Sequence, residues 1–195
     1  MMVIFILEKT NDKLELARNY NNIADAYLKN EEWESALEYA KKAAAVSQEI
    51  ENPRIEGYGR LNAGEALVKM GDTKKARIYH EICLDVFSHT QQKHDLGYCF
   101  YLGGIIETED GNYDKAEDYF TESLEILDMS DHRFQNARIY HEYGVLLLKL
   151  GEVEKAKEML QNSAIILEEY NCFKELKRVQ EKLDEIDGSE ETDEE

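Results

Sequence analysis

Histidine and cysteine are the side chains best suited to metal binding and nucleophilic chemistry, and in this chain their spacing fits neither. No two histidines have a spacing typical of a metal site; they are His80, His89, His94, His132 and His141. The three cysteines, Cys83, Cys99 and Cys172, lie far apart without a C-x-x-C pair, which is typical of free thiols in a reducing compartment. The sequence also lacks a glycine-rich phosphate loop, a nucleophile elbow and a zinc-binding helix motif. We therefore expect no metal, no cofactor and no catalysis by this chain.

Tyrosine and arginine offer a different chemistry, because together they often anchor the interface between two proteins. The chain holds 12 tyrosines, and two of them, Tyr58 and Tyr98, are forty residues apart. Arg18 lies forty residues before Tyr58, and Arg138 lies forty residues after Tyr98. Whether such residues form one surface depends on the elements that position them.

The chain is built on a period of forty residues. An alanine recurs at this interval, at Ala36, Ala76, Ala116 and Ala156. A second small residue precedes each alanine by twelve positions, at Ala24, Gly64, Gly104 and Gly144. A turn signal separates each pair, at Asn30-Glu31, Gly71-Asp72, Gly111-Asn112 and Gly151-Glu152. Three columns in phase over four copies indicate one helical hairpin repeated four times, and such hairpins stack into a solenoid.

Apolar residues three and four positions apart predict two helices in each unit. The first helices are expected at about 17–30, 55–70, 95–110 and 135–150, and the second helices at about 33–49, 73–89, 113–128 and 153–169. The small residues are expected where the two helices of a hairpin cross most closely, since a larger side chain would push the axes apart. The turn glycines can take the positive φ that ends a helix. In the first unit, where glutamate replaces glycine, Asn30 is expected to take that conformation.

The columns resemble those of the tetratricopeptide repeat (TPR) family. The first unit reads Tyr20, Ile23-Ala24, Tyr27 and Ala36, close to the family's succession of an aromatic, leucine-glycine, tyrosine and alanine. The fourth reads Tyr140, Tyr143-Gly144, Ala156 and Leu160. The late proline is missing, and the period of forty is similar to that of a longer-helix subclass that includes signalling adaptors, kinesin light chains and bacterial peptide-sensing regulators.

This resemblance implies an all-α fold, a right-handed α-solenoid of four TPR hairpins. The repeats would span about 17–50, 57–90, 97–130 and 137–170 of a single domain, 1–187, with a partial N-terminal helix in front and a capping helix at 173–187 behind. The acidic tail, 188–195, is expected to be disordered. The resemblance also implies a noncatalytic scaffold or adaptor that binds a segment of another protein in its concave groove.

In a TPR solenoid the first helices line the concave side, so columns of these helices that do not face the core are the candidate partner-binding residues. They are Arg18, Asn21, Asp25, Tyr58, Leu61, Asn62, Glu65, Tyr98, Tyr101, Arg138 and His141. The three tyrosines would form an aromatic floor, or else would cover neighbouring helices. Chaperone-adaptor TPR domains grip a terminal carboxylate at the places of Asn21 and Asp25, and Asp25 would repel one.

The net charge of −19 bears on the partner, because it disfavours nucleic acid and anionic membranes. Eight of these negative charges lie in the last twelve residues, which leaves −11 for the rest. The apolar start of the chain is too short to span a bilayer and lacks the basic flank and cleavage site of a signal peptide, so we expect a cytoplasmic protein.

The apolar start could itself be a contact surface. Met1, Ile4 and Phe5 would be partly uncovered if the array begins halfway through a hairpin, and self-association, a possible homodimer, would cover them. A cap that folds back, a short edge strand and a cut from a longer array are the alternatives. Two other functions therefore stay open beside the adaptor: a peptide-sensing regulatory domain, and a structural protein that self-assembles through this end.

Overall fold

The computed structural model describes residues 12–89, 93–128 and 133–193, and within these ranges it contains only helices and turns. Met1, Ile4, Phe5, His132 and the expected partial helix in front of the first unit lie outside the described residues. The helices are α2 (Lys13–Lys29), α3 (Trp33–Glu49), α4 (Pro53–Lys69), α5 (Thr73–Ser88), α6 (Lys93–Glu109), α7 (Tyr113–Asp128), α8 (Arg133–Leu150), α9 (Val153–Glu169) and α10 (Phe173–Asp193). The all-α fold predicted from the sequence is confirmed.

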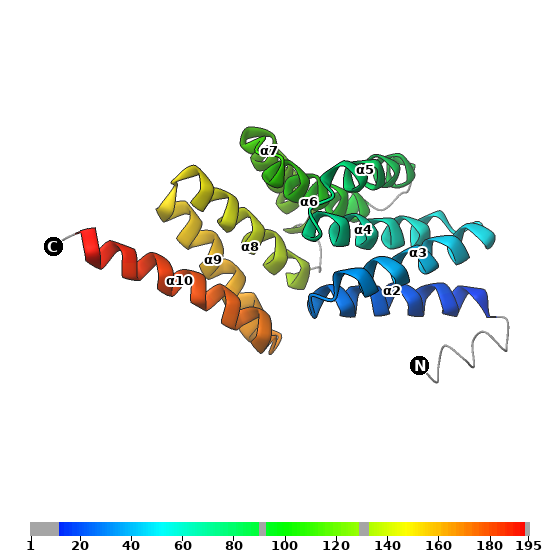
Figure 1. The fold of residues 1–195 in the computed structure, drawn as a ribbon, viewed down its shortest axis with the longest axis horizontal. Helices are drawn as coiled ribbons and strands as arrows, with labels where there is room; N and C mark the ends of the chain where they lie inside the picture. The colour runs from blue at the N-terminus through cyan, green and yellow to red at the C-terminus, as the bar shows by residue number, and fades with distance from the viewer. Residues whose placement is uncertain (1–11, 90–92, 129–132, 194–195) are drawn as a thin grey trace.

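Four helical hairpins follow one another, α2–α3, α4–α5, α6–α7 and α8–α9, and α10 packs on α9 (Figure 1). The first helices of neighbouring units touch each other, whereas each second helix packs mainly on the helices before and after it in the chain. The first helices therefore form the inner layer of a solenoid. The solenoid curls enough to bring α8 and α10 close to the C-terminal end of α2.

The first helices begin two to four residues before their predicted limits, and side-chain caps start two of them, α2 and α4. Asp12 accepts a hydrogen bond from the backbone N–H of Glu15 at 3.1 Å, and Asn52 accepts one from Ile55 at 3.2 Å. Pro53, which has no N–H to satisfy, follows Asn52 at the first helical position.

The turn inside each hairpin needs one residue with positive φ. Gly71, Gly111 and Gly151 meet this need at φ between 78° and 81°. In the first unit the expectation was wrong: Asn30 is right-handed at φ −87°, and Glu31 takes the left-handed conformation at φ 64°. The backbone dictates this choice, because the N–H of Glu32 must reach the carbonyl of Tyr27, which it does at 3.0 Å.

The small-residue columns lie at tight crossings, as predicted. The four alanines of the repeat column have no exposed surface. A Cβ added to Gly104 would lie 2.6 Å from the ring of Phe120, and one added to Gly144 would lie 2.9 Å from Leu160. The second unit differs, because Gly64 faces Leu102 of the next unit, at 2.7 Å. Glycine therefore allows a short distance between helices both within a unit and between neighbouring units.

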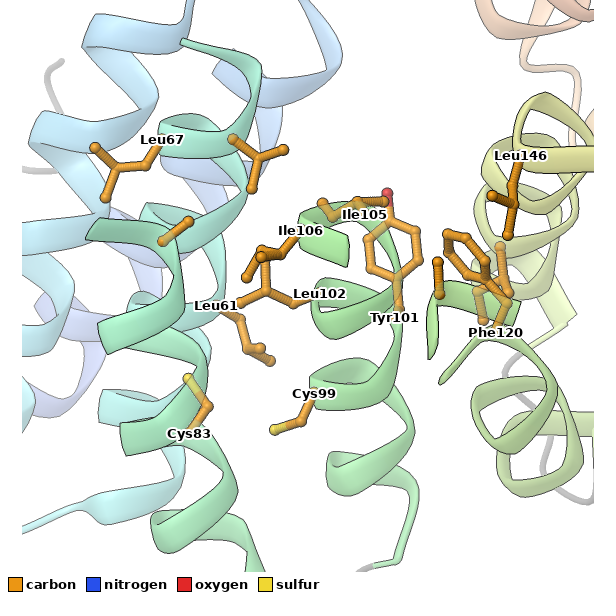
Figure 2. Close-up of a cluster of buried hydrophobic side chains, with 14 of the residues drawn as sticks. Leu61, Leu67, Cys83, Cys99, Tyr101, Leu102, Ile105, Ile106, Phe120 and Leu146 are labelled. Carbon is orange, nitrogen blue, oxygen red and sulfur yellow. The ribbon is translucent and has the colours of Figure 1, made fainter. Parts of the chain in front are cut away.

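The largest apolar cluster centres on α6 (Figure 2). Leu102 and Ile106 lie on its side toward α4, and Tyr101 lies on its side toward α8. Ile105, which shares its repeat column with the inner-face candidates Asp25 and Glu65, is only 2% exposed. The inner face of the middle units is therefore covered by the helices on either side.

The C-terminal helix is longer than predicted. Val179, Leu183 and Ile186 are its buried stripe, and its backbone is helical to Asp193. Gly188 keeps a negative φ and no proline follows, so nothing in the local backbone ends the helix there.

A buried carboxylate holds the end of α6. Glu107 is 1% exposed in a column where the other units have Tyr27, Leu67 and Leu147. It accepts hydrogen bonds from Arg77 at 2.6 Å, Lys115 at 2.5 Å and Asn112 at 2.8 Å. The hydrogen bonds from Arg77, more than any other contact, lower the pKa of Glu107 to about 2. Three donors thus compensate for the burial of this charge.

Gly104→Ala tests the tight crossing. The added methyl group would overlap the Phe120 ring, so we expect the unfolding free energy in urea to fall by about 1–3 kcal/mol. Gly188→Ala is the matched control, because nothing lies within 4 Å of its added Cβ, and we expect it to be neutral or slightly stabilising. Equal stability of the two variants would show that the crossing is not tight.

Glu107→Gln tests the buried carboxylate through its pH dependence. A folded-state pKa below the unfolded value of 4.5 means that the stabilisation is complete above about pH 4.5 and is lost as the pH falls toward about 2. We expect the variant to be roughly 2–3 kcal/mol less stable than the parent at neutral pH, with the difference shrinking through that window. Urea unfolding at a series of pH values measures it, and a difference independent of pH would contradict the assignment.

Candidate functional site

A cavity of about 200 Å³ lies on the inner face, where the C-terminal end of α2 meets α4, α6, α8 and α10. Four of the candidate partner-binding residues line it: Glu65, Tyr101, Arg138 and His141. Apolar side chains from first, second and capping helices form much of the remaining wall, among them Leu28, Trp33, Phe134, Leu167 and Val179. The curl of the solenoid has thus turned part of the open groove into a cavity.

Arg138 is the central charge of this cavity. It forms an ion pair with Glu65, which is 7% exposed, and its Nη1 is 3.9 Å from the carboxylate of Asp25. The guanidinium also lies over the ring of Tyr101, 5.5 Å from its centroid. Burial alone would lower the pKa of Arg138, but attraction to Glu65, Tyr101 and Asp25 raises it instead. One α8 side chain therefore joins residues of three earlier units, at intervals of 37, 73 and 113 positions.

A second ion pair forms the side of the cavity next to α4. Lys69 contacts Glu142 at 2.8 Å, and the two also line a smaller neighbouring cavity of about 160 Å³ with Ile105 and Val145. Burial would raise the pKa of Glu142, but the charge of Lys69, more than any other contact, lowers it. Glu142 is therefore a carboxylate at neutral pH.

His141 brings an unused polar atom to the cavity. Its Nδ1 is 3.7 Å from the carboxylate of Glu142, whereas its Nε2 is buried without a hydrogen-bond partner among the described residues. We assign the ring proton of the neutral form to Nδ1, because that nitrogen faces the carboxylate. Nε2 is then an acceptor that a bound molecule could satisfy.

Tyr58 and Tyr98 lie together, but they do not line this cavity. Their rings are edge to face with centroids 5.9 Å apart, near the N-terminal ends of α4 and α6. Tyr58 donates to Asp95 at 2.5 Å, and Arg54 donates to the same carboxylate at 3.0 and 3.3 Å. Burial, more than any other cause, raises the pKa of Tyr98 to about 12. The expected floor of three tyrosines is thus divided: two brace the start of α6, and Tyr101, which is 8% exposed, lies beneath Arg138.

The remaining candidates are engaged elsewhere. The amide of Asn62 donates to the side chain of Asn21 at 3.0 Å. Leu61 is 8% exposed and belongs to the main core cluster, not to an open groove. Arg18 is exposed near the start of α2, where it pairs with Glu15 at 2.6 Å. The inner-face columns were therefore a mixture of cavity residues, core residues and residues that link neighbouring helices.

Several cavity residues escaped the sequence analysis, including Trp33, Lys69, Phe134, Glu142 and Arg178. The repeat pattern identifies which residues face the next helix, but it does not show which units meet after the chain has curled. One signal was present: Glu142 stands in a column with Asn62 and Leu102, and a charge in such a column marks a place where the unit differs from its neighbours.

Comparison with known proteins agrees with this geometry. Three overlapping stretches, 15–88, 54–129 and 100–169, match the family described as tetratricopeptide repeat. The chain belongs to the tetratricopeptide repeat family. As a TPR protein it is in general terms a scaffold for protein interaction, and such repeats are generally noncatalytic.

One solved structure of low sequence identity shares the fold. The chain is similar to the crystal structure of BtubC (BKLC) from P. vanneervenii, with 15% identity, a TM-score of 0.60, and coverage of 91% of this chain and 82% of that one. It is also similar to the MamA RS-1 ArsTM double mutant, with 17% identity, a TM-score of 0.45, and coverage of 90% and 97% respectively. No curated protein matches the sequence significantly.

Two further kinds of site were not found in the part of the chain that the structure describes. No cluster of three histidine, cysteine or acidic side chains is arranged to hold a metal ion there. Nor does any helix in the same ranges have the length and apolar character needed to cross a membrane.

A double-mutant cycle tests the central ion pair. We expect Arg138→Met and Glu65→Gln to interact with a coupling free energy of about 1–3 kcal/mol in urea unfolding, because Glu65 is buried. The exposed pair of Arg18 and Glu15, changed to methionine and glutamine in the same way, serves as the control and should couple more weakly. Similar coupling in the two cycles would show that Arg138 does not link the units.

Proposed function

We propose that this TPR protein binds a short segment of another protein in the cavity on its inner face, without catalysis. The observation that carries the proposal is the cavity itself, which joins an apolar wall to a polar atom, His141 Nε2, that has no hydrogen-bond partner among the described residues. Binding sites commonly combine these two features, because apolar contacts give affinity and a few polar groups give orientation.

The size of the cavity suits one large side chain. A cavity of about 150 Å³ in an apolar core is known to bind benzene, and this one is about 200 Å³. A leucine, methionine or phenylalanine of the partner could lie against Phe134 and Leu167, which both contribute to the wall. The partner would thus be held by a single apolar anchor, and not by an extended aromatic floor.

The polar requirement is a hydrogen-bond donor. His141 Nε2 is buried and unsatisfied, and a main-chain N–H beside the anchor could donate to it. A buried acceptor that gains its partner only on binding favours the bound state, because leaving such an atom unpaired is costly. This feature supports a peptide segment over a purely apolar ligand.

A cytoplasmic location is part of this proposal, and the free state of Cys83, Cys99 and Cys172 supports it. Self-association through Met1, Ile4 and Phe5 stays a prediction, since these residues lie outside the described ranges.

Selection from a random peptide library displayed on phage, with the immobilised chain as bait, tests the function. Enriched peptides are synthesised, and their affinities are measured by calorimetry. We expect Phe134→Ala and His141→Ala each to weaken binding about tenfold or more, because they remove the wall and the acceptor of the cavity.

Two matched variants control for loss of stability and for changes elsewhere on the surface. Phe173→Ala removes an aromatic ring that is 68% exposed, and His89→Ala removes an exposed imidazole. Neither residue lines the cavity, so both variants should bind like the parent chain. A selection that enriches no peptide, or peptides that bind all four variants equally, would refute the proposal.

A further inference from the structure

The two ends of the solenoid meet mainly through side chains, and Lys174 of α10 also donates to the backbone carbonyl of Lys29 at 3.5 Å. Arg178 of α10 forms an ion pair with Glu31, just after α2, at 2.8 Å, and Arg138 of α8 lies 3.9 Å from Asp25. Lys29 places its ammonium group 5.2 Å from the centre of the Phe134 ring. Helix α2 makes its main backbone contacts with α3 and α4, and neither α8 nor α10 is among them. We call the contacts Arg178–Glu31 and Arg138–Asp25 the end bridge; Figure 1 shows the helices that it joins.

The end bridge is weak enough for a ligand to replace. The side chains of Arg178 and Glu31 are 34% and 50% exposed, and those of Arg138 and Asp25 are 30% and 36% exposed. Ion pairs of such exposure contribute little to stability and are screened by salt. The same residues border the cavity, because Glu31, Arg138 and Arg178 all line it. A segment that enters the cavity therefore meets the end bridge.

The two sides of the bridge carry opposite charges. Both carboxylates come from the N-terminal end of the solenoid, as does Glu65, and both cations come from the C-terminal end. In the pair of Lys69 and Glu142 the cation comes from α4 and the carboxylate comes from α8. This pair lies on the side of α4 and is not part of the bridge. An incoming cation would compete with arginine for the carboxylates, and an incoming anion would compete with the carboxylates for arginine.

Long-range charge decides between these two ligands. The net charge of the chain is −19, so its field attracts a cationic segment and repels an anionic one. The local chemistry agrees, because Asp25 and Glu31 already hold cations of this same chain. The arginines of the end bridge would thus occupy the places that a partner's cations take.

We propose that the segment bound in the cavity is basic, with lysine or arginine on both sides of its apolar anchor. Its cations replace Arg138 and Arg178 at Asp25 and Glu31, and binding opens the end bridge. This inference rests on the proposed function and adds the charge of the partner and the step that admits it.

Two fluorescein-labelled peptides, KKGSLSGKK and EEGSLSGEE, test the charge of the partner by fluorescence anisotropy in about 0.1 M salt. We expect the lysine probe to bind about tenfold or more tightly than the glutamate probe. Tighter binding of the glutamate probe would overturn the inference. The proposed function would still stand if peptides from the library selection need Phe134 and His141.

A second pair of variants tests whether the lysine probe binds by replacing the arginines of the end bridge or only because the whole protein is acidic. Arg178→Ala and Lys155→Ala each remove one positive charge, but only Arg178 belongs to the bridge, since Lys155 pairs with Glu152. We expect Arg178→Ala to bind the lysine probe about three- to tenfold more tightly, because a larger fraction of the chain is then open. Lys155→Ala should bind like the parent chain, and equal tightening by both variants would indicate attraction to net charge alone.

Asp25→Asn is the complementary change, with Asp118→Asn as its control on the exposed surface of α7. We expect the first to weaken binding of the lysine probe about threefold or more and the second to leave it unchanged. Small-angle scattering supplies the readout of opening: the radius of gyration should rise in Arg178→Ala and on saturation with the lysine probe. A radius that stays constant in both cases would overturn the opening step.

Discussion

The close approach of helices at small residues is the constraint on which the rest of this structure depends. The repeat-column alanines have no exposed surface, and a single added methyl group at Gly104 would overlap Phe120. Where such residues recur at a constant interval, each hairpin meets the next with a similar offset, and offsets of the same sense add up to a curved array. The curl that brings α8 and α10 near α2, and hence the cavity, follows from this repetition.

Buried charges distinguish the units from one another, although the helices of each unit cross at similar small residues. Asp95 and Glu107 are both almost completely buried in α6, and each accepts bonds from at least two donors of neighbouring helices. Such groups are costly to bury and are tolerated only when every partner is in place. These charged groups specify which helices pack against each other. The apolar columns are similar in every unit, so apolar contacts alone would allow any two units to pack together. The third unit, with both charges, is consequently the most distinctive part of the array.

The inner face is less open than a groove lined by four first helices would suggest. Leu61, Tyr101 and Ile105 are all covered, because each lies between two first helices that approach closely. What remains accessible is the cavity beside the end of α2, where units distant in sequence meet. Its polar residues bond mainly to one another, so a partner must either replace these contacts or use an acceptor that has no hydrogen bond within the described residues, such as His141 Nε2.

The sequence by itself determined the helices, the hairpins and the TPR family, since these depend on contacts between neighbours at a constant spacing. The glycine and alanine columns and the turn glycines are all local signals. Some local details were missed, such as the left-handed Glu31 and the extension of α10 to Asp193. Only the tertiary structure decided which inner-face residues form the cavity. Arg138 meets Glu65 and Asp25 because small rotations accumulate over several units, and no single repeat encodes their sum.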